Sequence, residues 1–263
     1  MTQINEKWVN GAVDVIVDVF KSFRPELMLA FGNVAYETKA NNTVVTDLDK
    51  KVETVLRKRL LDYDDSIGLL GEELGAEGDT GTMWLIDPID GTDQFVRGIP
   101  TCRNMVTLIR ESRPVMTVVY RFPTDDMFIA IEGKGTTKNG EVISVSNRDF
   151  AHTQVEFSSS FDNSVCGEIM NLFHRKAGGH SCHDWLMVVE GLRDAHCVFL
   201  GGGGDWDYAP RLLLLQETGA KVANIGPGPS SETWDYRNHS FLAANPEVFE
   251  DLLDAVQELV TKT

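Results

Sequence analysis

The sequence has no long hydrophobic run and no pattern that directs a chain across a membrane. Its longest obvious apolar run is Leu212–Leu215, far short of the roughly 18 residues that a membrane span needs. The first residues, MTQINEKWVN, lack the basic stretch and apolar core of a secretory signal peptide. We therefore expect no membrane-spanning segment and no membrane partner.

Cysteine is scarce and shows no pairing pattern. The chain has 263 residues, and its four cysteines, Cys102, Cys166, Cys182 and Cys197, form no CxxC motif. This spacing is typical of reduced thiols rather than of a disulfide framework or a zinc site, so we expect a cytoplasmic protein. His180 and His183 flank Cys182, and we interpret this segment as pocket or surface residues rather than as a transition-metal cluster.

The chain has few positively charged residues relative to its acidic residues. The chain has 24 Lys and Arg residues against 40 Asp and Glu residues, and its formal net charge is −16. Such a chain is a poor non-specific binder of nucleic acid, so no direct nucleic-acid contact is expected. A phosphorylated substrate is still compatible with this charge, because cations held by clustered carboxylates reverse the local field.

The hydrophobic spacing of the first part of the chain predicts a mixture of helices and strands. Apolar residues three and four apart predict helices over residues 4–22 and 47–61. Short apolar runs at 67–70 and 83–86 predict buried strands. Alternating residues from 104 to 145, separated by turn residues, predict an antiparallel meander.

After about residue 147, the spacing of apolar residues changes to a pattern that predicts alternating strands and helices. The pattern predicts helices near 164–175 and 183–193, a short strand at 195–199, and a helix at 207–218 closed by a glycine. The segments KVANI and HSFLAA predict two further strands. Asn245 as N-cap, followed by Pro246 at the first helical position, predicts a last helix.

The stretch WLIDPIDGTDQF joins an apolar strand to two carboxylates and a glycine turn. Asp87 ends the strand, and Asp90, three residues later, can point back to the same place. Gly91 permits a tight turn, and Thr92 can open a helical turn whose free N–H groups bind anions. Two hard oxygen ligands beside an anion site are what Mg²⁺ and a phosphate require together.

Other acids occupy similar places in the sequence, which favours a site over ordinary turn chemistry. Glu72 and Glu73 end an earlier apolar strand, and Asp207 follows four glycines at the start of a predicted helix. Ligand sites in α/β architectures collect at the ends of such elements. Gathering several carboxylates is costly unless cations neutralise them.

Five segments resemble the inositol monophosphatase family of Mg²⁺-dependent, lithium-sensitive sugar phosphatases. They are GEE at 71–73, WLIDPIDGTDQF at 84–95, DWDYAP at 205–210, VTDLDKKVE at 45–53 and GKGTTKNGEVISVS at 133–146. The resemblance covers nearly the whole chain in the right order. It implies the layered αβαβα fold shared with fructose-1,6-bisphosphatase. In that fold, residues 1–147 would form an α+β half with most metal ligands, and residues 148–263 an α/β half.

The resemblance implies a set of metal ligands. Glu72, Asp87 and the carbonyl of Ile89 would hold one Mg²⁺, and Asp87, Asp90 and Asp207 a second. Glu72 would also support a third, weaker ion, and it counts among the expected catalytic residues. Two or three Mg²⁺ ions per active site are therefore expected.

The resemblance also implies roles for the residues around these ligands. Asp49 would pair with Thr92 to orient and deprotonate the attacking water, and Asp47 stays open as the alternative acid. The backbone of Gly91 and Thr92, beside Asp90, would bind the phosphate. Metal ions that cancel the charge of a phosphate ester and activate a bound water make a nucleophilic side chain unnecessary.

The substrate side is less defined in the sequence. Ser181 and Asp184, at the start of a predicted helix, are candidates to contact the leaving group. Asp205 is a candidate for the acid that binds ring hydroxyls in the family, and Asp207 would contribute as well. The glycine run before them leaves the alignment of this region open.

The expected function is Mg²⁺-dependent hydrolysis of a small phosphate monoester, with inositol monophosphate as the leading substrate. Histidinol phosphate is the near alternative because FVRGIP resembles sequences of that branch, and fructose 1,6-bisphosphate and nucleotide 3′,5′-bisphosphates follow. The resemblance implies a homodimer and inhibition by Li⁺. A different class is also open, because some family members are accessory proteins of the transcription machinery.

Overall fold

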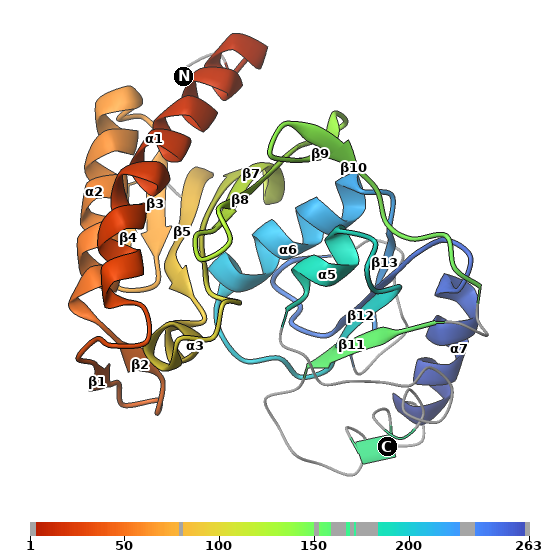
Figure 1. Ribbon diagram of the computed structural model, residues 1–263. Coiled ribbons are helices and arrows are strands. Elements are labelled where there is room, and N and C mark those ends of the chain that lie inside the picture. Colours follow the sequence, from red (N-terminus) through yellow and green to blue (C-terminus); the bar gives the residue numbers. More distant parts are fainter. Residues whose placement is uncertain are drawn as a thin grey trace. The chain divides into compact units, whose positions relative to one another are not determined.

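The chain forms two compact units, residues 1–132 with 137–140 and residues 133–136 with 141–263. The structure is a computed structural model (Figure 1). It describes residues 4–78, 81–149, 153–158, 167–168, 171, 184–226 and 235–260. The change of sequence rhythm near residue 147 falls within the second unit.

The first unit is built on a large sheet. Its helices are α1 (Glu6–Ala30), α2 (Asp47–Tyr63) and α3 (Thr92–Arg97). The strands are β1 (Glu37–Thr38), β2 (Val44–Val45), β3 (Gly68–Gly71), β4 (Gly75–Glu77), β5 (Thr82–Asp90), β6 (Arg103–Arg110), β7 (Arg113–Arg121) and β8 (Asp126–Ile131). Two more strands of the large sheet, β9 (Gly135–Lys138) and β10 (Glu141–Ile143), include residues that are assigned to the second unit. The large sheet has the order β10-β9-β8-β7-β6-β5-β3-β4, and β1 and β2 form a separate ribbon. β5 pairs with β3 in parallel and with β6 antiparallel.

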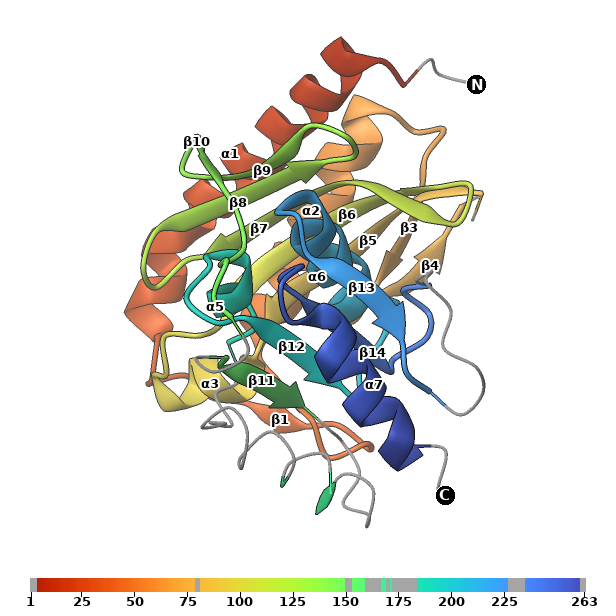
Figure 2. The same ribbon diagram turned by 90° about the vertical axis from the view of Figure 1, so that its right-hand side faces the viewer.

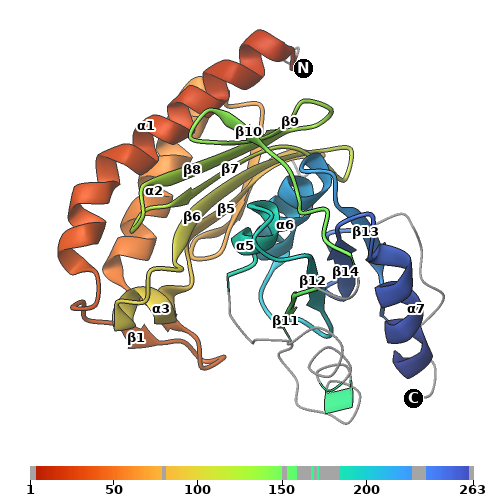
Figure 3. The same ribbon diagram turned by 45° about the vertical axis from the view of Figure 1, so that its right-hand side comes forward.

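Helices α1 and α2 lie side by side on one face of this sheet (Figures 1 and 3). Their buried apolar stripes form one core with the strands, which includes Phe20 and Leu56 from the helices and Trp84 and Val106 from the sheet. Asn5 caps α1 by accepting a 3.0 Å hydrogen bond from the Trp8 amide.

Helix α1 continues to Ala30, eight residues beyond the predicted end at residue 22. It passes through Pro25, a residue that removes one helical hydrogen bond. Phe23 and Leu27 are buried in the core and extend the apolar stripe past the proline. Packing of this stripe therefore outweighs the proline in setting the length of the helix.

The second unit holds a four-stranded sheet between two helices. Its elements are β11 (Val155–Ser158), α5 (Leu186–Val189), β12 (Ala195–Val198), α6 (Asp205–Glu217), β13 (Lys221–Asn224), β14 (Phe241–Ala244) and α7 (Phe249–Val260). The strand order is β11-β12-β14-β13, with β11 and β12 parallel and the other pairs antiparallel.

The two helices cover opposite faces of this sheet. Helix α7, which crosses the sheet in Figure 2, packs its Leu252 into a cluster with Cys197 and Leu242. Tyr208 of α6 lies edge-on against Phe241, the strand neighbour of Leu242. Because successive strand residues point to opposite faces, α6 and α7 lie on different sides.

Two helix predictions in the second half were wrong in extent. The helix expected at 183–193 is the single turn Leu186–Val189, and Gly191 follows it in the left-handed conformation that commonly ends helices. The last helix begins at Phe249 rather than at Pro246. The Val248 amide donates to the Asn245 carbonyl three residues back, so Asn245 opens a turn that precedes the helix.

Two further predictions concern the helix expected at 164–175 and the absence of a membrane span. Most of the helix predicted at 164–175 lies outside the described residues, although residues 167–168 and 171 within it are helical. Among the helices in the described part of the chain, none has the length and hydropathy needed to cross a bilayer.

Candidate active site

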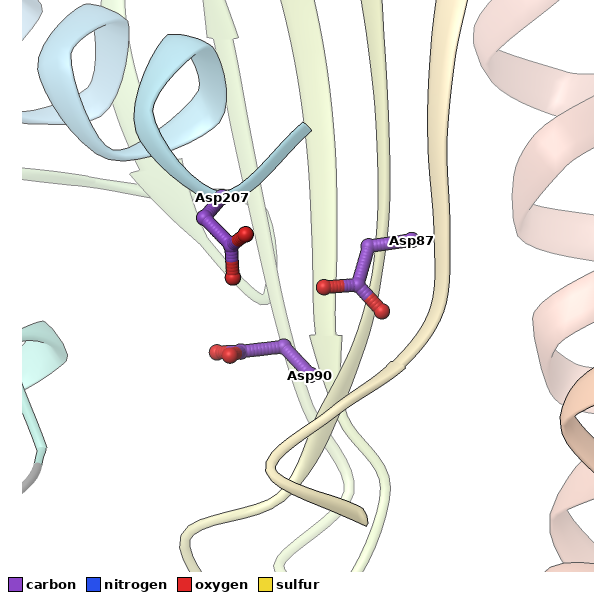
Figure 4. A group of neighbouring side chains, drawn as sticks. All are labelled: Asp87, Asp90 and Asp207. Carbon is purple, nitrogen blue, oxygen red and sulfur yellow. The ribbon is translucent and has the colours of Figure 1, made fainter. Parts of the chain in front are cut away.

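The end of β5 brings Asp87 and Asp90 to the same side of the strand. In a regular strand, residues three apart point to opposite faces. Here Asp87 pairs with Met105 and Asp90 with Arg103, so three steps along β5 match two steps along β6. This β-bulge corrects the mismatch, and Figure 4 shows both carboxylates on one side of the strand. One oxygen from each lies within 4.8 Å of the other.

The surroundings of this pair fit a divalent cation. Asp87 is buried, and Arg103, which is also buried, holds Asp90 with an Nε–Oδ2 distance of 2.8 Å. Two neighbouring carboxylates repel each other unless cations offset their charge. The available donors are carboxylate and carbonyl oxygens, the ligands that Mg²⁺ prefers. Sequence reasoning missed Arg103, because the bulge that sets it opposite Asp90 has no evident signal in the sequence.

Glu72 follows the last residue of β3, whose strand partner Ile86 directly precedes Asp87. Gly71 pairs with Ile86, and the Glu72 amide donates to the Ile86 carbonyl at 3.1 Å. Burial raises the pKa of Glu72, and Glu73 and Asp49 add to this effect. A carboxyl in this environment gains from a nearby positive charge.

Lys39, which sequence reasoning also missed, supplies one such charge. Its Nζ lies 2.9 Å from Glu72 Oε1 and 2.6 Å from Glu73 Oε1. Burial works to lower the pKa of Lys39, but the hydrogen bonds to Glu73 and Glu72 outweigh it and raise the pKa. An ammonium group therefore offsets the negative charge of the two glutamates.

Asp49, and not Asp47, lies against Thr92. Asp47 is exposed, whereas Asp49 is buried and its Oδ1 accepts a 3.0 Å hydrogen bond from Thr92 Oγ1. Thr92 Oγ1 also lies 2.9 Å from the Ile89 carbonyl oxygen. Gly91 takes the left-handed conformation, with φ of 81°, and so turns the chain from β5 into Thr92.

The environment of Asp49 suits a proton acceptor. Burial raises its pKa to about 6, although hydrogen bonds from Thr46 and Thr92 work in the opposite direction. The Thr46 amide and hydroxyl donate to Asp49 Oδ2 at 2.8 and 2.6 Å, an arrangement that also caps α2. A carboxyl with a pKa near the working pH is well placed for general base catalysis.

The remaining residues that the sequence predicts for the site belong to the second unit. Figure 4 shows Asp207 in the first turn of α6, where its Oδ2 accepts a 2.7 Å hydrogen bond from the Gly204 amide. Asp205, two residues earlier, lies 3.5 Å from His239 Nε2. Asp184 is buried and accepts from the Leu186 amide at 3.3 Å, just before α5. Ser181 lies outside the described residues, as does the segment His180–His183.

Arg97 lies close to the site in sequence, but an acid on its own helix holds it. Its Nε donates to Asp93 Oδ1 at 2.9 Å, and both side chains are exposed. This i,i+4 pair is an ordinary surface interaction of α3.

Comparison with known proteins finds one family over nearly the whole chain. The family model described as "Inositol monophosphatase family" matches residues 1–261. The chain is 30% identical over 197 residues to the Nus factor SuhB of Xylella fastidiosa, covering 71% of each chain. It is 28% identical over 235 residues to inositol monophosphatase 1 of Solanum lycopersicum, covering 83% of this chain and 84% of the relative.

The solved structures agree on the fold. The IMPase of Thermotoga maritima superposes with a TM-score of 0.81 at 22% identity, covering 95% of this chain and 98% of that one. This likeness confirms the layered α/β fold expected from the sequence.

Proposed function

Because the chain belongs to the inositol monophosphatase family, we propose that it is a Mg²⁺-dependent phosphomonoesterase acting on a small phosphorylated polyol or alcohol. One observation carries the proposal. A bulge aligns Asp87 and Asp90 at the end of β5, and Thr92, two residues after Asp90, donates a hydrogen bond to Asp49, whose pKa is raised.

The carboxylates are proposed to hold the metal ions. Asp87, Asp90 and Asp207 are of the type and number that suits one ion, and Glu72, Asp87 and the Ile89 carbonyl would hold another. Glu72 would also support a third, weaker ion. Bound Mg²⁺ supplies a Lewis acid that offsets the charge of the phosphate and lowers the pKa of a bound water.

Thr92 and Asp49 are proposed to take the proton from the attacking water. Thr92 Oγ1 accepts this proton and passes its own to the Asp49 carboxylate, 3.0 Å away. The water oxygen adds to phosphorus, the bond between phosphorus and the ester oxygen breaks, and the leaving alcohol takes a proton from solvent. The amides of Gly91 and Thr92, beside Asp90, are proposed to bind the phosphate oxygens.

The leaving alcohol is proposed to contact Ser181, Asp184, Asp205 and Asp207. Inositol monophosphate is the leading substrate, because the chain resembles inositol monophosphatase 1 of tomato over most of its length. Histidinol phosphate, fructose 1,6-bisphosphate and nucleotide 3′,5′-bisphosphates are the alternatives. We also propose that the protein works in the cytoplasm as a homodimer.

A second candidate function is an accessory role in transcription, which the resemblance left open and which the similarity to a Nus factor keeps open. This chain would then act as an accessory protein, and phosphate hydrolysis would be secondary or absent. Such a role does not require the pairing of Asp49 with Thr92. Capture of the transcription machinery by tagged protein that is inactive on every phosphate ester tested would favour this alternative.

The test is phosphate release across a panel of inositol 1-phosphate, histidinol phosphate, fructose 1,6-bisphosphate and adenosine 3′,5′-bisphosphate. Each is assayed with and without Mg²⁺, using wild type and Asp90→Asn. Turnover that requires Mg²⁺ and is lost in the variant supports the proposal, and the best substrate identifies the branch. Turnover that is insensitive to both changes contradicts it.

A further inference from the structure

The chain turns sharply just after Glu72. Glu72 follows β3, and the chain returns antiparallel along β4, with Gly71 paired with Gly75. The amides of Glu73 and Leu74 lie in this turn and need acceptors. The position of Glu72 therefore depends on how the turn that follows it is held.

One buried side chain from α2 holds both amides. Glu53 is fully buried, and its Oε2 accepts from the Glu73 amide at 2.8 Å, while its Oε1 accepts from the Leu74 amide at 3.1 Å. Arg57, one helical turn later, donates from Nε to Glu53 Oε1 at 2.9 Å. The Arg57 guanidinium also donates to the Gly75 carbonyl. The two side chains thus bind the turn at three successive residues.

Gly71 is required for this approach of the carboxylate. A Cβ added at Gly71 would lie 2.0 Å from Glu53 Oε1 and 2.4 Å from its carboxyl carbon. Both distances are far shorter than a non-bonded contact. The backbone of Gly71 is not in the left-handed region, so its lack of a side chain makes room for Glu53 rather than for an unusual conformation.

The same face of α2 carries Asp49, four residues before Glu53. Residues four apart lie above one another on a helix. One helix therefore contacts Thr92 through Asp49 and the turn after Glu72 through Glu53.

We propose that Glu53 is a positioning residue for the metal site: it fixes the turn after Glu72 and so sets the place of the Glu72 carboxylate beside Asp87. This inference rests on the proposed function, since it takes Glu72 as a metal ligand. Residues that orient metal ligands typically change metal affinity about 10–100-fold when altered. A purely structural Glu53 would instead lower stability without a specific effect on metal binding.

The test measures Mn²⁺ binding to the full chain by the loss of the free Mn²⁺ electron paramagnetic resonance signal, with thermal unfolding recorded without metal. Glu53→Gln keeps the size of the side chain but sets an amide N–H against one of the two backbone donors. We expect it to weaken Mn²⁺ binding about 10–100-fold. Asp126→Asn is the matched control, because it also converts a hydrogen-bonded carboxylate of the first unit into an amide, and we expect unchanged Mn²⁺ affinity.

A second set of variants tests the same inference without Glu53→Gln. Gly71→Ala displaces the Glu53 carboxylate and should weaken Mn²⁺ binding in the wild-type background. In a Glu53→Ala background the space is free, so the added methyl should have little further effect. An undiminished effect of Gly71→Ala in that background would contradict the positioning role.

The outcomes separate this inference from the proposed activity. Folded Glu53→Gln with wild-type Mn²⁺ affinity overturns it, as does an equal loss in Asp126→Asn. If wild type binds Mn²⁺ but hydrolyses no phosphate ester, the proposed activity is contradicted, and the comparison of Mn²⁺ affinities still tests the role of Glu53. Wild type that binds no Mn²⁺ overturns both.

Discussion

Asp49 combines two roles at the scale of a single residue, because it caps α2 and contacts Thr92. We expect Asp49→Asn to lower kcat about 10²–10⁴-fold, the range for loss of a general base. A base must be ionised, and burial raises the pKa of Asp49 to about 6. Wild-type activity should therefore fall as the pH drops below about 6. The measurement is kcat against pH for both proteins, and a wild-type acid limb retained in the variant would contradict the role.

Asp126 gives the opposite pKa shift at a position away from the candidate site. Burial works to raise its pKa, but hydrogen bonds from Thr124, Arg121 and Lys138 lower it to about 2. A carboxyl with a lowered pKa adds stability above its unfolded pKa of about 3.9, and this is lost as the pH falls toward 2.

We expect Asp126→Asn to lower the free energy of unfolding at pH 7 by about 1 kcal/mol, after allowance for solvent screening of the pair. The difference between variant and wild type should shrink as the pH falls from about 4 to 2. Denaturant unfolding at several pH values checks this, and a difference that is independent of pH would contradict it.

Part of the candidate site could be read from residue type and spacing. Glu72 and Asp87 follow short apolar runs, and Asp90 comes three residues after Asp87, which the sequence shows directly. The partners of Glu72 and Asp90 could not be read, because Lys39 and Arg103 reach them through tertiary contacts between separate segments. The same holds for Glu53, which binds the amides of the turn after Glu72. The structure also separates exposed Asp47 from buried Asp49, which spacing alone left open.

At the scale of elements, α1 contains a proline that its packing tolerates. Pro25 is exposed in the interior of the helix and supplies no N–H to the carbonyl four residues before it. We expect Pro25→Ala to raise the free energy of unfolding by about 1–3 kcal/mol, because alanine restores the hydrogen bond and has the best helix propensity. Thermal unfolding measures this, and a lower midpoint than wild type would show that the proline fits a local bend of the helix.

Periodicity predicted most helices and strands but not where all of them end. The meander and the two long helices of the first unit follow from the spacing of apolar residues. The bulge between Asp87 and Asp90 and the turn before α7 depend on strand register and on single hydrogen bonds. Hydrophobic patterns carry no information about either feature.

At the scale of the whole molecule, the order of the motifs identifies the family more firmly than it identifies the substrate. Residues 1–261 match the family, yet the relatives include both a Nus factor and an inositol monophosphatase. The acids that are proposed to hold metal lie near the ends of regular elements, and such positions are readable from sequence. The proposed alcohol-binding residues include Ser181, which lies outside the described residues.

We expect Li⁺ to inhibit phosphate release, because a small monovalent ion can take a Mg²⁺ position but offsets less charge there. Inhibition should be strong at millimolar LiCl, and the same concentration of NaCl should have little effect. Initial rates in the two salts at fixed ionic strength provide the measurement. Equal rates would count against a lithium-sensitive metal site.

The most direct test of the central claim is phosphate release from inositol 1-phosphate as Mg²⁺ is titrated into metal-free wild type and into Asp87→Asn. Asp87 is buried and is proposed to contact two ions, so replacing its carboxylate by the amide of asparagine should abolish activation. We predict no release without Mg²⁺, saturable activation of wild type, and at least a 10²-fold lower rate in the variant, a loss in the range for removal of one catalytic charge interaction. Phosphate release by metal-free wild type, or full activation of the variant, would contradict a metal-dependent mechanism.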